Sequence, residues 1–139
     1  MSLMLVSFVA SAQRDLKCYP VFQGKIVPKK QMVVTEARGS SMSDYKLDYY
    51  RGVTIMGEED LIRQIASLVA MDAEAAPVKE TETVGDMLTY ALVQPASNGK
   101  INRYLCYQAR KLDDKWKLTL LYLEGPATLE DLRKTFEKQ

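Results

Sequence analysis

The chain has 139 residues, a formal net charge of +1 and 47% hydrophobic residues, a composition typical of one globular domain that buries its own core. So small a net charge provides no field to attract nucleic acid, and we expect no nucleic-acid partner. The absence of histidine excludes Ser-His-Asp and Cys-His catalysis and zinc sites with histidine ligands. No pattern in the sequence indicates a cofactor or a metal site. No apolar stretch reaches the roughly 20 residues that a membrane-spanning helix needs.

The first thirteen residues resemble the end of a secretory signal peptide. An apolar run covers residues 3–9, and Ala10-Ser11-Ala12 has the small-x-small pattern after which signal peptidase cleaves. No Lys or Arg precedes Arg14, so we interpret residues 1–12 as a truncated signal peptide and residues 13–139 as a single domain. The alternative is a short buried strand or helix that ends in Ala-Ser-Ala. The signal-peptide interpretation predicts a periplasmic or secreted protein.

The two cysteines, Cys18 and Cys106, are too few to form a cysteine-rich zinc site. In an oxidising compartment they can form a disulfide that ties the N-terminal segment to the sheet. The alternative is a pair of buried free thiols that pack like small hydrophobic side chains. Because two cysteines so far apart carry little positional information, both alternatives stay open.

The first half of the domain predicts two strands and a helix. Residues 31–37 and 53–56 are rich in β-favouring residues and are bounded by Pro or Gly, which is typical of strands. A helix is predicted from residue 57 to about residue 72, because an apolar stripe recurs there at helical spacing. The stripe consists of Leu61, Ile62, Ile65, Leu68 and Val69. The polar run 79–83 is predicted to be a solvated loop.

The second half predicts a three-stranded antiparallel meander and a closing helix. The strands cover residues 87–94, 102–111 and 116–123, and Asn98-Gly99 is the strongest turn signal in the chain. The third strand is apolar on both faces near its end, which places it centrally in the sheet. Residues 128–131 resemble a helix capping box. The buried side of the closing helix is predicted to consist of Leu129, Leu132 and Phe136.

The order of these elements is β-β-α-β-β-β-α, which favours the α+β class. We expect an antiparallel sheet of about five strands with two helices packed on one face.

Residues 44–51 form the best candidate for a ligand-binding site, because they interleave tyrosines with charges of both signs. Exposed tyrosines suit the binding of a sugar or a peptide. The candidate side chains are Tyr45, Tyr49, Tyr50 and Arg51. The competing interpretation, which such an alternation favours, is a half-buried element whose aromatic side chains face the core.

Two other groupings favour structural roles. The acids Glu58, Glu59 and Asp60 come together at a predicted helix start, where they complement the helix dipole and do not face one another as a catalytic pair would. Cys106 has no histidine to activate it, so a buried thiol or half-cystine is favoured over a nucleophile. We therefore assign no catalytic residue.

Three blocks of sequence point to a known family: YKLDYYRGVTI (45–55), GKINRYLCYQ (99–108) and LTLLYLEGPATLEDLRK (118–134). Together with the signal remnant they resemble a small family of secreted proteins from Bacteroidetes that is catalogued as a domain of unknown function. The resemblance implies a signal peptide followed by one α+β domain, and an envelope or secreted location in a Gram-negative bacterium. It supplies no catalytic residues.

These observations predict an exported, non-enzymatic domain that binds an envelope protein or a small ligand. One alternative is a small envelope enzyme that uses Asp, Glu or Tyr chemistry, which would require a deep pocket with converging groups of perturbed pKa. Another is a structural accessory subunit of an envelope assembly, which would show an exposed sheet edge or a self-complementary face.

Overall fold

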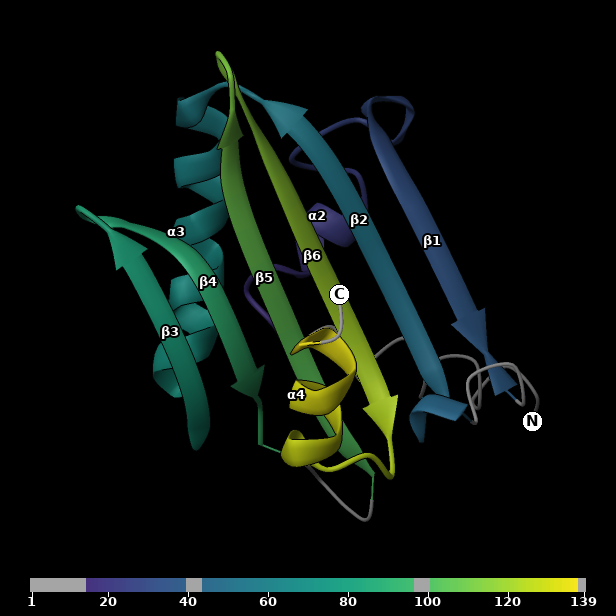
Figure 1. Cartoon of the computed structure of the whole chain (residues 1–139). Coiled ribbons are helices and arrows are strands. Elements are labelled where there is room, and N and C mark those ends of the chain that lie inside the picture. Colours follow the sequence, from purple (N-terminus) through teal and green to yellow (C-terminus); the bar gives the residue numbers. More distant parts are fainter. Residues whose placement is uncertain (1–14, 40–43, 97–100, 138–139) are drawn as a thin grey trace.

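A computed structural model describes residues 15–39, 44–96 and 101–137, with side chains up to residue 134. In these residues six strands form one antiparallel sheet in the order β1-β2-β6-β5-β4-β3 (Figure 1). The predicted α+β class is confirmed, with one strand more than expected. The strands are β1 (Met32–Arg38), β2 (Tyr49–Gly57), β3 (Val78–Val84), β4 (Met87–Gln94), β5 (Asn102–Leu112) and β6 (Lys115–Gly125).

The strands β4, β5 and β6 form the predicted meander, because each lies beside the next in the sheet. β6 also pairs with β2, and this pairing joins the two halves of the chain. The predicted central position of β6 is confirmed. This position explains why β6 has buried side chains on both of its faces. Leu118 and Leu120 are buried on one face, and Leu123 is buried on the other.

The two longer helices lie on opposite faces of the sheet (Figure 1). α3 (Glu59–Ala75) is the helix predicted over residues 57–72, which is confirmed. It shares its face with the short helix α2 (Tyr19–Phe22), whereas α4 (Leu129–Glu137) packs on the other side. We call the two sides the α3 face and the α4 face. The expectation that both helices pack on one face is wrong.

The reason for this arrangement is that both faces of the sheet carry buried apolar side chains. The α3 face is covered by α3 and by residues 16–27. Within this segment, Val21 and Phe22 are completely buried against the sheet. At one end of the α4 face a second cluster would otherwise be exposed to water, and α4 covers it. This cluster consists of Leu47, Tyr104, Leu123, Ala127 and Leu132.

The connection from β6 to α4 depends on a close approach at Gly125. Its φ is 156°, and a Cβ atom there would lie 2.6 Å from Leu47 Cα and 2.8 Å from the Asp48 backbone nitrogen. The helix then begins with reciprocal bonds, because the Thr128 N–H donates to Asp131 Oδ2 (2.9 Å) and the Asp131 N–H donates to Thr128 Oγ1 (3.2 Å). The predicted capping box is confirmed.

Residues 79–83, which we expected to form a loop, belong to the edge strand β3, so this prediction is wrong. Six of the seven β3 residues are exposed, and among the described strands β3 pairs only with β4. An edge strand of this kind has no buried face and therefore no alternation of apolar and polar residues. The sequence signal for a strand was absent for that physical reason.

Some predictions fall outside the described residues, namely the signal peptide (1–12), the Asn98-Gly99 turn and the side chain of Phe136. Among the described helices, none has both the length and the apolar character needed to cross a membrane.

Candidate binding site on the open face of the sheet

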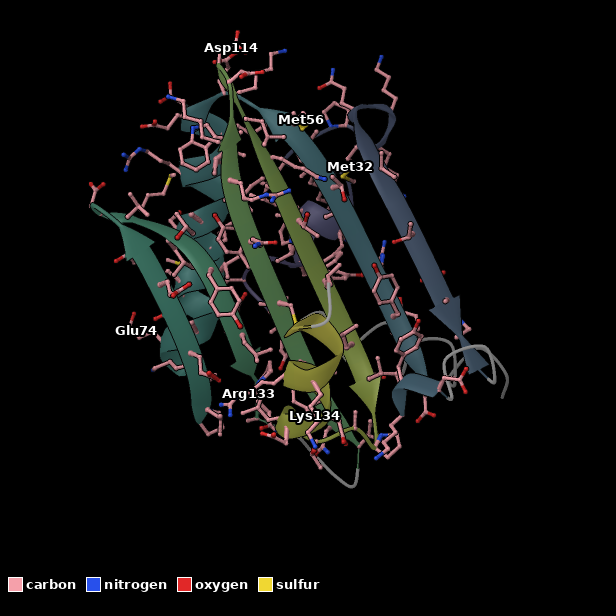
Figure 2. All side chains as sticks on the ribbon, in the orientation of Figure 1. Met32, Met56, Glu74, Asp114, Arg133 and Lys134 are labelled. Carbon is pink, nitrogen blue, oxygen red and sulfur yellow. The ribbon has the colours of Figure 1, made fainter. Side chains whose placement is uncertain are left out.

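α4 covers only one end of the α4 face (Figure 1). In Figure 2, Arg133 marks the covered end, while Met56 and Asp114 lie at the opposite end, where no described helix packs on this side. We call the uncovered part the open face. The strand pairing shows which side chains share it, because directly opposite residues point to the same side of a sheet.

The row of side chains nearest α4 is apolar. Gly52 lies opposite Leu121, Leu121 opposite Cys106, and Cys106 opposite Leu92. A Cβ atom at position 52 would lie 2.8 Å from Leu121 Cδ2, so glycine makes room for the leucine side chain. This row, which we call the apolar floor, forms a shallow apolar surface beside α4.

The next row is polar from β2 to β4. Thr54 lies opposite Thr119, Thr119 opposite Gln108, and Gln108 opposite Tyr90. Two hydroxyls, an amide and a phenol therefore line up across four strands, and each can both donate and accept a hydrogen bond.

The third row contains two cations that face each other. Arg110 lies directly opposite Lys117, which has Met56 on its other side. Like charges in directly opposite positions destabilise a sheet. Within the described part of the chain, neither Arg110 nor Lys117 forms an ion pair. The far end of the open face therefore carries two adjacent cations.

A hollow of about 370 Å³ lies over β4, β5 and β6 and touches all three rows. Its volume is at the lower end of the roughly 300–1,000 Å³ that small-molecule sites occupy. The side chains lining it combine the apolar floor, the polar row and one of the two cations. They include Tyr90, Leu92, Cys106, Gln108, Arg110, Thr119 and Leu121.

The Cys106 thiol and the Tyr90 phenol in the hollow stay protonated near neutral pH. Burial raises the pKa of the Cys106 thiol to about 12. The pKa of Tyr90 is also raised, mainly by burial and then by its neighbours Cys106, Glu80 and Glu82. The hollow therefore offers a neutral thiol and a neutral phenol together with the Arg110 guanidinium.

A second hollow, of about 340 Å³, lies between α3 and the turn that joins β3 to β4. Its charged side chains are already paired, because Arg63 Nη1 lies 2.9 Å from Asp86 Oδ1 and Arg63 Nε lies 3.0 Å from Glu59 Oε2. The remaining lining is mostly small or apolar, with Ala66 and Ala70 from α3. The charged side chains that line this hollow are both held in ion pairs, so the open face is the better candidate.

The structure places the four tyrosine and arginine candidates on different sides of the sheet. Tyr49 and Arg51 point to the α3 face, while Tyr50 points to the α4 face and packs against the cluster beneath α4. Tyr45 precedes β2 and is exposed. Among the four, only Tyr49 and Arg51 share a face, because they are alternate residues of the half-buried strand β2.

Tyr49 and its neighbours form matched polar contacts. The Tyr49 hydroxyl donates to Glu36 Oε2 (2.6 Å), and its ring packs edge-to-face on Tyr122 with centroids 6.3 Å apart. Arg51 Nη2 donates to the carbonyl of Phe22 (3.0 Å) and lies over the Phe22 ring. These contacts join β1, β2, β6 and α2.

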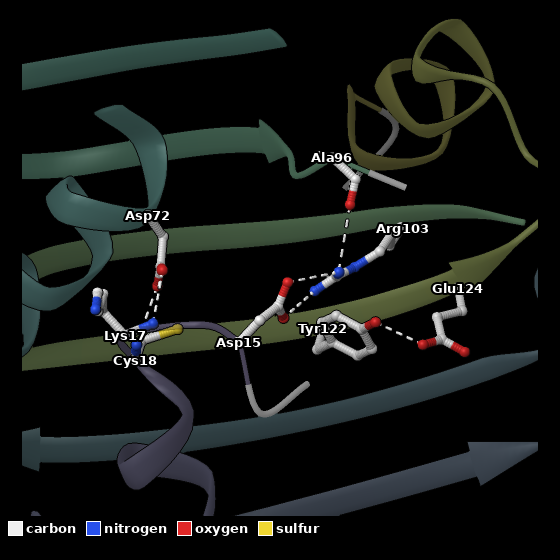
Figure 3. A network of polar contacts seen from close by, with 8 residues as sticks. All are labelled: Asp15, Lys17, Cys18, Asp72, Ala96, Arg103, Tyr122 and Glu124. Carbon is white, nitrogen blue, oxygen red and sulfur yellow. Dashed lines mark hydrogen bonds and ion pairs between the residues drawn. The ribbon is translucent and has the colours of Figure 1, made fainter. Parts of the chain in front are cut away.

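A related network holds residues 15–18 against the sheet and α3 (Figure 3). Arg103 donates to both carboxylate oxygens of Asp15, at 3.0 and 2.8 Å, and its guanidinium lies over the Tyr122 ring. Nearby, the Tyr122 hydroxyl donates to Glu124 Oε2 (2.5 Å). Each of these interactions is made within the chain, which indicates a structural role.

Asp72 provides the second anchor in this network. Its carboxylate is buried and accepts the backbone N–H groups of Lys17 (2.6 Å) and Cys18 (3.0 Å) (Figure 3). These two donors lie at the start of α2, where backbone N–H groups lack helical partners. The buried charge is thus balanced by the hydrogen bonds that fix the N-terminal segment.

Both cysteines are free thiols in the structure. Cys18 lies in the core of the α3 face, and Cys106 lies on the α4 face, so the sheet separates them. Burial, followed by the nearby Asp72 carboxylate, raises the pKa of the Cys18 thiol well above its usual value. In these positions both cysteines are protonated thiols that pack like small apolar side chains.

Of the residues that line the open face, only Cys106 was singled out from the sequence, and not as part of a ligand-binding site. The alternation in β5 places Tyr104, Cys106 and Gln108 on one face, but only the pairing with β6 shows that Arg110 faces Lys117. A charged residue at the end of each of two predicted strands is otherwise typical of a solvated surface.

The fold and this site define an α+β domain with a half-covered antiparallel sheet and a ligand-sized hollow on its open face. Residues 5–136 match the family of unknown function DUF6108, and the chain belongs to this family. The predicted resemblance to a family of unknown function is confirmed to that extent. No curated protein and no solved structure matches the chain.

Proposed function

We propose that this chain is an exported, non-enzymatic binding domain that holds a small anionic ligand on its open face. The observation that carries the proposal is the direct opposition of Arg110 and Lys117 beside the hollow. Such a pair costs stability in the empty protein, whereas an anion placed between the two side chains would be attracted by both.

The rest of the hollow defines the chemical class of the ligand. Leu92 and Leu121 offer apolar contact, while Gln108 and Thr119 offer hydrogen bonds to oxygen atoms. With a net charge of only +1, the attraction is local and not a property of the whole molecule. A small carboxylate with an apolar part fits this combination best.

Binding is favoured over catalysis by the state of the groups in the hollow. The raised pKa of Cys106 opposes formation of the thiolate that a nucleophile requires. The raised pKa of Tyr90 likewise opposes its use as a base. The enzyme alternative would need a general base in this hollow, and the described lining contains none.

Isothermal titration calorimetry with acetate, succinate and benzoate would test ligand binding, with inorganic phosphate as a second class of anion. The Arg110→Gln/Lys117→Gln variant should bind the best carboxylate at least ~10-fold more weakly, because charge-assisted hydrogen bonds contribute about 1.5–3 kcal/mol each.

The matched control is Lys111→Gln, which removes a cation from the adjacent residue of β5 on the opposite face. It should leave the dissociation constant unchanged. The proposal is contradicted if no anion binds the unmodified protein, or if the control weakens binding as much as the double variant does.

Export is the second part of the proposal. It is supported by the apolar run and the Ala-Ser-Ala box in residues 1–12, and by the resemblance to secreted proteins from Bacteroidetes. Expression of the full-length gene in such a host, followed by fractionation and N-terminal sequencing, should yield a protein that begins at Gln13 in the periplasm, at the surface or in the medium. Cytoplasmic protein that retains residues 1–3 would contradict it.

A further inference from the structure

The edge strand β1 presents backbone groups that can pair with another strand. Among the described strands it pairs only with β2. The Gly39 N–H donates to the Asp48 carbonyl (2.9 Å) in continuation of this ladder. Because alternate residues bond in an antiparallel ladder, Thr35 and Val33 also bond toward β2. The N–H and C=O groups of Val34 and Glu36 therefore point away from the sheet.

The two edges of the sheet differ in how they are protected. β3 carries Lys79, Glu80 and Glu82, and its pairing with β4 is interrupted between Glu82 and Thr83. Charges and bulges of this kind are devices by which proteins prevent pairing at a sheet edge. β1 pairs with β2 in an unbroken register and contains neither proline nor lysine.

β1 also exposes apolar side chains at its centre. Val33 is 64% exposed and Val34 is 43% exposed, on opposite faces of the strand. Its two charged residues, Glu36 and Arg38, neutralise each other at 3.5 Å and both contact Tyr49. The strand thus has no net charge that would repel a second copy of itself.

We propose that β1 pairs antiparallel with β1 of a second copy of this chain, around a two-fold axis at Val34. In this register Val34 lies opposite Val34 of the second copy, Val33 lies opposite Thr35, and Met32 lies opposite Glu36. The outward-pointing groups of both strands are satisfied, and β-branched side chains form the central pairs. Like charges do not face each other within the paired strands, and Arg38 comes level with Lys30 just beyond the end of the second copy's β1.

This register is preferred to two-fold axes at Thr35 and at Glu36. An axis at Glu36 would place the two Glu36 carboxylates directly opposite each other, which is destabilising. An axis at Thr35 would place the two Glu36 carboxylates diagonally across the strand pair. It would also put each Val34 opposite Glu36 of the other copy and not opposite Val34. The axis at Val34 brings the exposed valines together, and this contact removes apolar surface from water.

The dimer leaves the proposed ligand site accessible. The hollow is lined by residues of β4, β5 and β6, whereas the interface lies along the outer edge of β1, with β2 between them. Each proposal can therefore fail without the other. The dimer would also give the structural-subunit alternative a physical basis, since two open faces would join into one continuous surface.

The first test is sedimentation equilibrium of the full chain and of the Val34→Pro variant. Val34→Pro removes an N–H group that points outward, so the β1–β2 ladder is retained. The unmodified protein should have twice the mass of the variant at the same concentration, while circular dichroism shows both to be folded. A protein that stays monomeric up to about 1 mM, or a dimer that survives Val34→Pro, overturns the proposal.

A second test needs no proline. Val34→Lys and Val34→Glu each place like charges on the two-fold axis and should each be monomeric, whereas an equimolar mixture should recover the dimer. Thr81→Lys, on the opposite edge strand, is the matched control and should remain dimeric. A dimer that only Thr81→Lys disrupts, or a mixture that stays monomeric, overturns the assignment to β1.

Discussion

At the scale of single residues, the polar contacts of the α3 face connect strands that are distant in sequence. Glu36 on β1 accepts the hydroxyl of Tyr49 on β2, and the Tyr49 ring packs on Tyr122 of β6. The pKa of Glu36 is lowered, mainly by the hydrogen bond from Tyr49, with Arg38 adding to the effect. This carboxylate therefore links the stability of the sheet to pH.

The Glu36→Gln variant should reveal this link in urea unfolding between pH 7 and pH 3. A lowered folded-state pKa means that the ionised carboxylate stabilises the fold above its ordinary pKa of 4.5. The free energy of unfolding of the unmodified protein should exceed that of the variant at pH 7. Since the side chain is 44% exposed, the difference should be below about 1 kcal/mol.

This difference should shrink as the pH falls below 4.5 and vanish once the pH passes below the folded-state pKa of Glu36. In a Tyr49→Phe background, which lacks the main cause of the shift, Glu36→Gln should have a much smaller effect. A difference that is constant over this range, or that grows on acidification, contradicts the assignment.

At the scale of elements, the course of the chain after β6 decides which face α4 covers. The turn at Gly125 brings the backbone of β6 against residues 46–48, and the Ala127 N–H then donates to the Lys46 carbonyl (2.8 Å). From this point α4 can reach the Tyr104 and Leu123 side chains. The glycine is thus a determinant of the layer arrangement.

Gly125→Ala should lower the free energy of unfolding by roughly 3 kcal/mol or more, because the added Cβ meets backbone atoms that cannot move independently of the sheet. Gly85→Ala is the matched control. Gly85 has a φ of +62° but nothing within 4 Å of an added Cβ, so it should lose only about 1 kcal/mol. Equal losses in urea unfolding would show that the close approach is unimportant.

The same scale explains the limits of prediction from the sequence. α3 was predictable because its stripe reflects burial against one surface, and β6 because it is apolar on both faces. β3 was not predictable, because an edge strand whose two faces are both exposed needs no alternation of apolar and polar residues. Periodicity reports that an element is buried, but it does not report which neighbour buries it.

At the scale of the whole molecule, the sheet is covered unequally. α3 and residues 16–27 cover the α3 face, whereas α4 covers one end of the other. The uncovered remainder holds the hollow beside Arg110 and Lys117, and the uncovered edge holds Val33 and Val34. Both proposals of binding therefore arise from surfaces that the fold itself leaves open.

The sequence by itself determined the α+β class, the meander, the two helices and the capping box, because local spacing and turn chemistry encode these features. The tertiary structure alone decided that the helices lie on opposite faces and that Tyr49 and Tyr50 separate. It also decided that Arg110 meets Lys117. These last features depend on strand register and on the path of the chain between elements, and both are set by contacts between residues far apart in sequence.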